Sequence, residues 1–172
     1  YWDLYERNEI PLAENPDRPH GAPLMATNTM RELIRGYYDF NEAPRPDQGT
    51  LTEEQARLLK HGYYASVSYV DAQVGRLLDE LQRLGLWENT IVVLWGDHGW
   101  KLGEHNSWCK MTNYEIDARV PLIMRAPGAS ENGNQCDRLV EFVDVYPSLC
   151  EAAGLPIPDG LEGLSFAPLL ED

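Results

Sequence analysis

The stretch TIVVLWGDHG, residues 90–99, decides the fold class. Residues 90–95 form a continuous apolar run rich in β-branched side chains, which is typical of a strand buried on both faces of a parallel sheet. Two glycines then flank Asp97 and His98, so the sequence predicts a tight turn directly after the strand. Because ligands of parallel α/β sheets collect at the carboxyl ends of strands, we expect a functional site at this turn.

A long helix is expected before the strand. Thr52 and Gln55 have the spacing of a capping box, in which each side chain bonds the other residue's backbone N–H. Apolar residues then recur every three or four positions, and the helix is expected to end near Gly85. Internal glycines at positions 62 and 75 leave open whether it is one helix or two.

Shorter elements are predicted around this helix and strand. A second strand is expected over 121–124, a short helix capped by Asp144 is expected to end at Gly154, and a last helical turn is expected over 166–170. Residues 1–50 are rich in Pro, Asn, Asp and Gly, which predicts irregular structure with one short helix over 29–37. The sequence thus predicts a loop-rich region over 1–50 and an α/β region over 51–172.

Composition excludes some classes of function. The net charge is −14 and no basic face is visible, which argues against a nucleic-acid-binding protein. No apolar run reaches the length needed to span a bilayer. The three cysteines form no CxxC motif, so one disulfide with a spare thiol and three reduced thiols both stay open. Binding of an anion would need local cations, and the clearest group of them is His98, Lys101, His105 and Lys110.

The turn after the strand carries the candidate chemistry. A carboxylate such as that of Asp97 is the usual ligand of Ca²⁺ or Mg²⁺, while a histidine is more common on Zn²⁺. An isolated Asp-His pair is more often a capped turn beside a loop histidine. Here Trp100, His105 and Lys110 follow closely, which suits an anion site with flat indole walls. The alternatives are a solvated surface lysine at 110 and simple packing of the tryptophan at 108.

The same residues carry a family resemblance. The segment GDHGWKLGEHNSWCK, residues 96–110, resembles the second metal-ligand motif of sulfatases, specifically of the iduronate-2-sulfatase-like branch of this alkaline-phosphatase-like superfamily. Many other sulfatases have Asn in place of His98. Further segments are similar to the same branch, in the same order: YASVSYVDAQVGRLL at 64–78, VPLI at 120–123 and VDVYPSL at 143–149.

The resemblance implies a fold, a reaction and roles. The fold would be part of an alkaline-phosphatase-like sandwich, with a mainly parallel central sheet flanked by helices. The reaction would be hydrolysis of sulfate esters on a sulfated uronic acid or related glycan, as in glycosaminoglycan degradation, in a periplasmic, extracellular or lysosomal setting. Asp97 and His98 would bind Ca²⁺, Lys110 would contact the sulfate and steady the departing oxygen, Trp100 would stand beside the sugar ring, and His105 would lie near the sulfate.

One departure from the family limits this expectation. The formylglycine nucleophile of sulfatases is made within a Cys/Ser-x-Pro/Ala-x-Arg signature, and neither Cys109, Cys136, Cys150 nor any serine begins such a run. The upstream Asp-Asp metal pair is also missing. We therefore expect this chain to be inactive by itself and to need a preceding segment of the same enzyme, without which the fold is also incomplete.

Two other functions stay open from the sequence. A phosphoesterase or phosphonate hydrolase of the same superfamily would carry Thr or Ser as nucleophile, with extra Zn²⁺ ligands, in the preceding segment. A non-catalytic relative that binds sulfated glycans would lack the modifiable Cys or Ser altogether.

Overall fold

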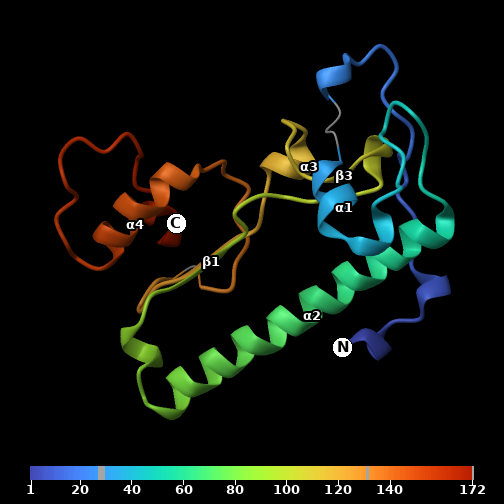
Figure 1. The fold of residues 1–172 in the computed structure, drawn as a ribbon. Coiled ribbons are helices and arrows are strands. Elements are labelled where there is room, and N and C mark those ends of the chain that lie inside the picture. The colour runs from blue at the N-terminus through green and yellow to red at the C-terminus, as the bar shows by residue number, and fades with distance from the viewer. Residues whose placement is uncertain (27–29, 131, 172) are drawn as a thin grey trace. The chain divides into compact units, whose positions relative to one another are not determined.

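The computed structural model describes residues 1–26, 30–130 and 132–171. The chain divides into two compact units, and Figure 1 shows their elements. The first unit comprises Tyr1–Leu77 and Gly96–Val120, and the second comprises Leu78–Trp95 and Pro121–Asp172. Helices and strands both occur, so the predicted α/β class is confirmed.

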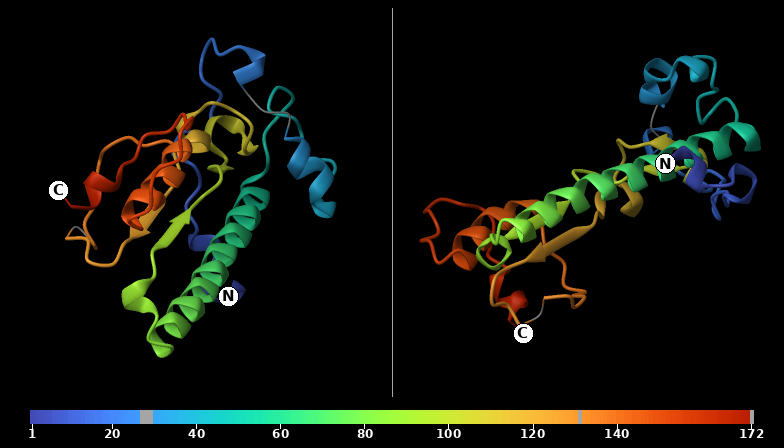
Figure 2. Two further views of the ribbon diagram at one scale, coloured as in Figure 1. Left: turned by 90° about the vertical axis from the view of Figure 1, so that its left-hand side faces the viewer. Right: turned by 90° about the horizontal axis from the view of Figure 1, so that it is seen from below.

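Helix α2, Glu53–Arg83, is one continuous helix, as Figure 2 shows. The predicted capping box is confirmed: the Thr52 N–H donates to Gln55 Oε1 at 3.0 Å, and the Gln55 N–H donates to Thr52 Oγ1 at 3.2 Å. The helix ends where Gly85 takes a φ of +69°, a left-handed conformation that glycine adopts without steric cost. The internal glycines therefore do not split the helix.

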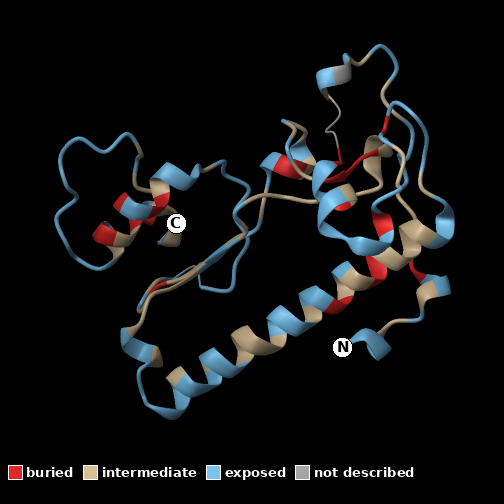
Figure 3. Cartoon of the chain, in the orientation of Figure 1, coloured by how far each residue is buried: buried red, intermediate tan, exposed pale blue. Residues whose placement is uncertain are grey.

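The core of the first unit lies where α1, Arg31–Gly36, meets the strand β3, Trp108–Cys109. Its buried cluster consists of Met30, Leu33, Phe40, Trp108 and Cys109. In α2 the buried residues all belong to the amino-terminal half of the helix, as Figure 3 shows, and they are Lys60, His61 and Ala65.

The first fifty residues contain one α-helix and several 3₁₀ turns in their described part. The predicted helix over 29–37 corresponds to α1, although position 29 lies outside the described residues. The 3₁₀ turns are Trp2–Leu4, Arg7–Glu9, Leu24–Ala26 and Tyr38–Phe40. The first of them is held to α2, because the Trp2 ring stacks on His61 with ring centroids 4.0 Å apart.

Both predicted strands exist, but their pairing differs from the prediction. Strand β1, Val92–Trp95, pairs antiparallel with β4, Leu122–Arg125. The parallel arrangement expected for β1 is therefore wrong for this neighbour. Burial of β1 on both faces is also wrong within the described residues, since Leu94 is 41% exposed and Trp95 is 49% exposed. An apolar run predicts that both faces of a strand pack against other parts of the protein, but it does not specify the direction of the neighbouring strand.

A second antiparallel pair was not predicted from the sequence. Strand β2, Lys101–Leu102, pairs with β3, with Lys101 opposite Cys109 and Leu102 opposite Trp108. The 3₁₀ turn Glu104–Asn106 connects them. This small hairpin places the residues that follow the Asp-His turn into the core of the first unit.

The second unit carries α4, Val145–Ala152, and the predicted stop at Gly154 is confirmed by its φ of +68°. Asp144 is the N-cap residue of α4, as predicted, but its side chain accepts no capping hydrogen bond at this helix. A 3₁₀ turn, Phe142–Asp144, precedes α4, and the Asp144 carboxylate instead accepts the N–H groups of Glu141 and Leu164 at 2.9 and 2.8 Å.

The remaining elements of the second unit are short. The expected last turn is confirmed as the 3₁₀ turn Ala167–Leu170, and another 3₁₀ turn, Trp87–Asn89, precedes β1. Cys109, Cys136 and Cys150 are free thiols in this structure, so no two of them are bridged to each other. No helix in the described part of the chain is both long enough and apolar enough for a bilayer crossing.

We expect Thr52→Ala to lower the free energy of unfolding by about 1 kcal/mol, because the substitution removes the hydroxyl that caps α2. Chemical denaturation followed by circular dichroism measures this change. Gly75→Ala in the same helix is the matched control with the opposite sign: no atom lies within 4 Å of the added Cβ, and alanine should stabilise the helix by about 0.5–1 kcal/mol. Equal stability of both variants and the unsubstituted chain would contradict the assignment.

Candidate functional site

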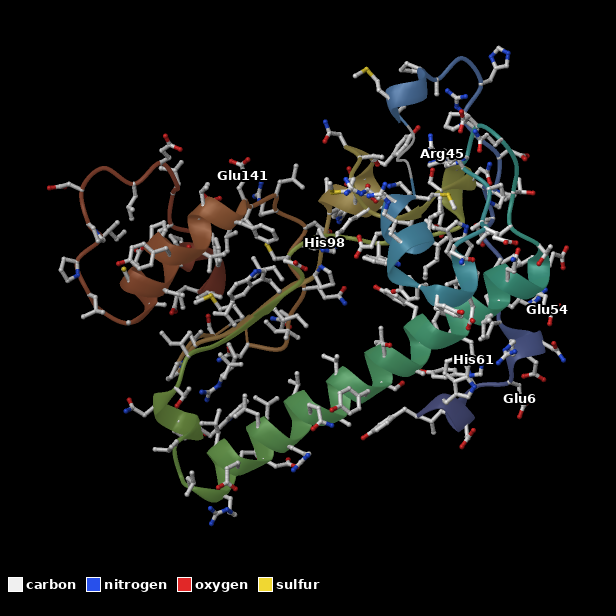
Figure 4. All side chains as sticks on the ribbon, in the orientation of Figure 1. Glu6, Arg45, Glu54, His61, His98 and Glu141 are labelled. Carbon is white, nitrogen blue, oxygen red and sulfur yellow. The ribbon has the colours of Figure 1, made fainter. Side chains whose placement is uncertain are left out.

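Asp97 and His98 lie on the segment between β1 and β2, where Figure 4 labels His98. Their side chains are 84% and 34% exposed. Oδ1 of Asp97 accepts the backbone N–H of His98 at 3.1 Å, which turns the carboxylate back over the histidine. Oδ2 of Asp97 then lies 3.4 Å from Nε2 of the His98 ring.

The other ring nitrogen of His98 determines what Nε2 can do. Nδ1 lies 2.9 Å from the carbonyl oxygen of Gly99, and a carbonyl only accepts hydrogen bonds, so Nδ1 carries a proton. In the neutral ring, Nε2 therefore presents a lone pair to a carboxylate oxygen. Two acceptor atoms so close repel each other unless a second proton or a cation lies between them. This donor set fits one side of a cation site, with a carboxylate oxygen and an imidazole nitrogen as ligands.

The described residues supply only part of such a site. Nowhere in residues 1–26, 30–130 and 132–171 do three or more His, Cys, Asp or Glu side chains gather closely enough to hold a metal ion. Calcium takes roughly six to eight oxygen ligands, so the pair of Asp97 and His98 would leave most positions to other groups.

The backbone of Gly99 fixes where the Asp-His turn lies. The Gly99 N–H donates to the carbonyl oxygen of Asp117 at 2.8 Å, and Asp117 belongs to the short helix α3, Glu115–Ala118. A Cβ at position 99 would come within 1.8 Å of the Ile116 carbonyl oxygen, so only glycine fits this approach. At Gly96, on the other side of the turn, the nearest atom to an added Cβ is 3.4 Å away.

Trp100 brings His98 and Lys110 together. The His98 and Trp100 rings stack at a centroid distance of 6.0 Å and an interplanar angle of 28°. Nζ of Lys110 lies 5.0 Å from the centre of the Trp100 ring, which is a cation–π contact. The same Nζ is 3.2 Å from the Glu32 carboxylate, so Lys110 is held in place rather than simply solvated.

Glu32 is a member of this group that the sequence did not indicate. It lies on α1, 78 residues before Lys110, outside the segments quoted above for the family resemblance. No motif around Glu32 predicts the pairing with Lys110.

A cavity of about 490 Å³ in the first unit borders the Trp100 ring. Its lining is mostly aromatic and apolar and includes Tyr37, Tyr38 and Tyr63. Trp108 also contributes to the lining, but it is 4% exposed and belongs to the buried core cluster, which agrees with the packing alternative for this residue.

His105 and Lys101 do not join the group formed by His98, Trp100 and Lys110. The His105 ring packs on Tyr114 at a centroid distance of 4.6 Å, and no contact among the described residues joins it to His98 or Trp100. Lys101 was expected among the anion-binding cations, and this is wrong: its side chain is fully buried and forms an ion pair with Asp117. Lys101 is the buried residue of β2, and the Asp117 carboxylate compensates its charge there.

Cys109 lies beside Lys110 but is chemically quiet. Burial raises the pKa of its thiol to about 11, and the negative charge of Glu32 acts in the same direction. At neutral pH the side chain is therefore a protonated thiol that packs in the core.

Comparison with known proteins places these features in a family. Residues 18–155 match the family model described as Sulfatase. The chain is 36% identical to iduronate 2-sulfatase of Homo sapiens, over 90% of this chain and 32% of that protein. The chain thus spans about a third of the length of this relative.

Solved structures agree with this match. A phosphonate monoester hydrolase from Silicibacter pomeroyi is similar with a TM-score of 0.73 and 28% identity, over 98% of this chain and 33% of that one. A protein described as a 2-O GAG sulfatase is similar with a TM-score of 0.72 and 28% identity, over 94% and 34%. The fold is therefore of the alkaline-phosphatase-like kind.

We expect Gly99→Ala to lower the free energy of unfolding by about 1–3 kcal/mol, because the new methyl group collides with the Ile116 carbonyl. Gly96→Ala, on the other side of the same turn, is the matched control and should change stability little. Chemical denaturation of both variants checks this, and a Gly99→Ala variant as stable as Gly96→Ala would contradict the close approach.

We expect a thiol-alkylating reagent at pH 8 to label Cys136, which is exposed, and to leave Cys109 unmodified. With a pKa of about 11, the thiolate fraction of Cys109 at that pH is only about one in a thousand. Mass spectrometry of the digested protein identifies the labelled cysteine. Labelling of Cys109 as fast as Cys136 without denaturant would show that the core around β3 opens readily.

Proposed function

Because this chain belongs to the sulfatase family, we propose that the complete protein is a sulfuric ester hydrolase that depends on Ca²⁺ and on a formylglycine nucleophile. One observation carries the proposal beyond family membership. Oδ2 of Asp97 and Nε2 of His98, both suited to bind a cation, lie 3.4 Å apart on an exposed turn.

Asp97 and His98 would hold one side of the calcium ion. Nδ1 of His98 donates to the Gly99 carbonyl, which orients the ring and leaves Nε2 for the metal. Bound calcium would supply positive charge to the sulfuryl oxygens, where negative charge grows during transfer.

Lys110 would contact the sulfate group and stabilise the charge that develops on the departing oxygen. Glu32 and Trp100 hold its ammonium from two directions, at 3.2 Å and 5.0 Å, so the charge needs little reorganisation when substrate binds. The indole of Trp100 offers a flat face for a sugar ring beside the aromatic cavity. For His105 we propose a place on the sulfate side, reached when the rest of the site is assembled.

The nucleophile and the other metal ligands would come from a segment that precedes this chain in the same enzyme. Three observations support this. No cysteine or serine here begins a formylglycine signature, the chain spans about a third of its human relative, and the strand residues Leu94, Trp95 and Ile123 leave large apolar surface exposed. We propose that β1 and β4 join a mainly parallel central sheet that buries these side chains, with 51–172 as the carboxy-terminal part of that domain and 1–50 as a loop-rich region over it.

For the substrate we propose a sulfated uronic acid or a related sulfated glycan. Support comes from the names of two relatives, an iduronate 2-sulfatase and a 2-O GAG sulfatase. Similarity to a phosphonate monoester hydrolase supports phosphonate or phosphoester hydrolysis as the second candidate. Assaying the purified complete protein on matched sulfate and phosphonate esters separates the two, and binding of sulfated glycans without turnover would instead favour a non-catalytic relative.

We expect Asp97→Ala in the complete protein to weaken calcium binding and to lower kcat/KM for a sulfate ester by at least about 100-fold, since a charged metal ligand is lost. Asp79→Ala, which removes an exposed carboxylate from α2, is the matched control and should behave like the unsubstituted enzyme. Calorimetry with calcium and steady-state kinetics give both readouts. Normal activity of Asp97→Ala, or release of sulfate by the 172-residue chain alone, would refute the proposal.

A further inference from the structure

The ion pair between Lys101 and Asp117 is the most deeply buried pair of charges in the described residues. The Lys101 side chain is 0% exposed and that of Asp117 is 3% exposed. Removing two charges from water costs about as much as their attraction returns, so apolar side chains of similar volume would stabilise this position at least as well. Stability alone therefore does not explain the pair, and its contacts point to another role.

One carboxylate oxygen of Asp117 accepts hydrogen bonds from two parts of the candidate site, one just after His98 and one just after Lys110. Oδ2 of Asp117 accepts Nζ of Lys101, which follows His98 closely. It also accepts the backbone N–H and the hydroxyl of Thr112, at 2.8 and 2.7 Å, and Thr112 follows Lys110 closely. The other oxygen, Oδ1, is buried and has no hydrogen-bond partner within the described chain. All of the compensation thus comes from the two segments that Asp117 joins.

The backbone of Asp117 continues this connection to the candidate metal ligand. Its carbonyl oxygen accepts the Gly99 N–H at 2.8 Å, and the Gly99 carbonyl accepts Nδ1–H of His98 at 2.9 Å. A displacement of Asp117 would therefore move the carbonyl that sets the orientation and the tautomer of His98. Lys101 is also connected to His105, the third candidate site residue. Its Nζ lies 5.8 Å from the ring centre of Tyr114, and the His105 ring packs on that tyrosine.

From these contacts we propose that Asp117 and Lys101 are positioning residues of the sulfatase site. The pair fixes Gly99, and through it Nε2 of His98, for calcium, and it fixes Thr112 and thereby the segment that carries Lys110. Neither residue touches substrate or metal. The inference rests on the proposed function, because it presupposes that calcium binds at Asp97 and His98.

The test uses the complete enzyme and measures calcium affinity by calorimetry together with kcat/KM. Asp117→Asn removes the charge but retains an acceptor oxygen for Thr112. The double variant Lys101→Met with Asp117→Leu replaces the pair by apolar side chains, so it should stay folded where a single change leaves a charge unpaired. We expect both variants to bind calcium roughly 10–100-fold more weakly, with kcat recovering toward the unsubstituted value at saturating calcium.

Arg83→Met is the matched control, because it breaks the ion pair with Glu80 on the exposed surface of α2. It should leave calcium affinity unchanged. Unchanged affinity in the folded double variant would overturn the positioning role, even if the enzyme is a calcium-dependent sulfatase. Failure of the unsubstituted enzyme to bind calcium would instead refute the calcium site itself, and the positioning role with it.

A measurement on the unsubstituted enzyme decides the question if the variants do not fold. Hydrogen exchange followed by mass spectrometry should show that calcium slows exchange in peptides covering 97–102 and 112–118 together, because the amides of Gly99 and Thr112 both bond to Asp117. Protection limited to 97–102 would contradict the connection through Asp117.

Discussion

The contact between the backbone of Gly99 and that of Ile116 and Asp117 constrains the rest of the site. There is no room for a side chain at position 99, and the amide of that residue is committed to the Asp117 carbonyl. This contact therefore fixes the position of the turn that carries Asp97 and His98. The orientation of the His98 ring follows, because its Nδ1 bonds to the carbonyl of the same glycine.

The chemistry of the site is divided between this turn and groups beyond it. Within the first unit, Trp100 lies between His98 and Lys110, and Glu32 on α1 holds the lysine. The Asp97 and Glu32 carboxylates offset the charges of the nearby cations, and the net charge of the chain is −14, so recognition of a sulfate group would depend on the bound calcium ion for additional positive charge. The nucleophile and further metal ligands are proposed to lie in a preceding segment.

Local patterns predicted the elements that depend on neighbouring residues. The capping box of α2, the left-handed glycine after α4 and the two strands all follow from short-range rules. The antiparallel direction of β1 and β4 could not be predicted, because an apolar run in one strand carries no information about the direction of the strand that pairs with it. The Glu32–Lys110 pair and the inward position of Lys101 also could not be predicted, since both depend on which distant segments meet. A lysine in an isolated sequence is expected to be solvated.

The central claim is that this chain supplies one side of a calcium site in a sulfatase. A crystal structure of the complete protein grown with calcium tests it most directly. The account predicts a calcium ion bound by a carboxylate oxygen of Asp97, at about 2.3–2.6 Å, and by Nε2 of His98, with its remaining ligands outside these 172 residues. A calcium ion elsewhere, or one whose protein ligands all belong to this chain, would contradict the account.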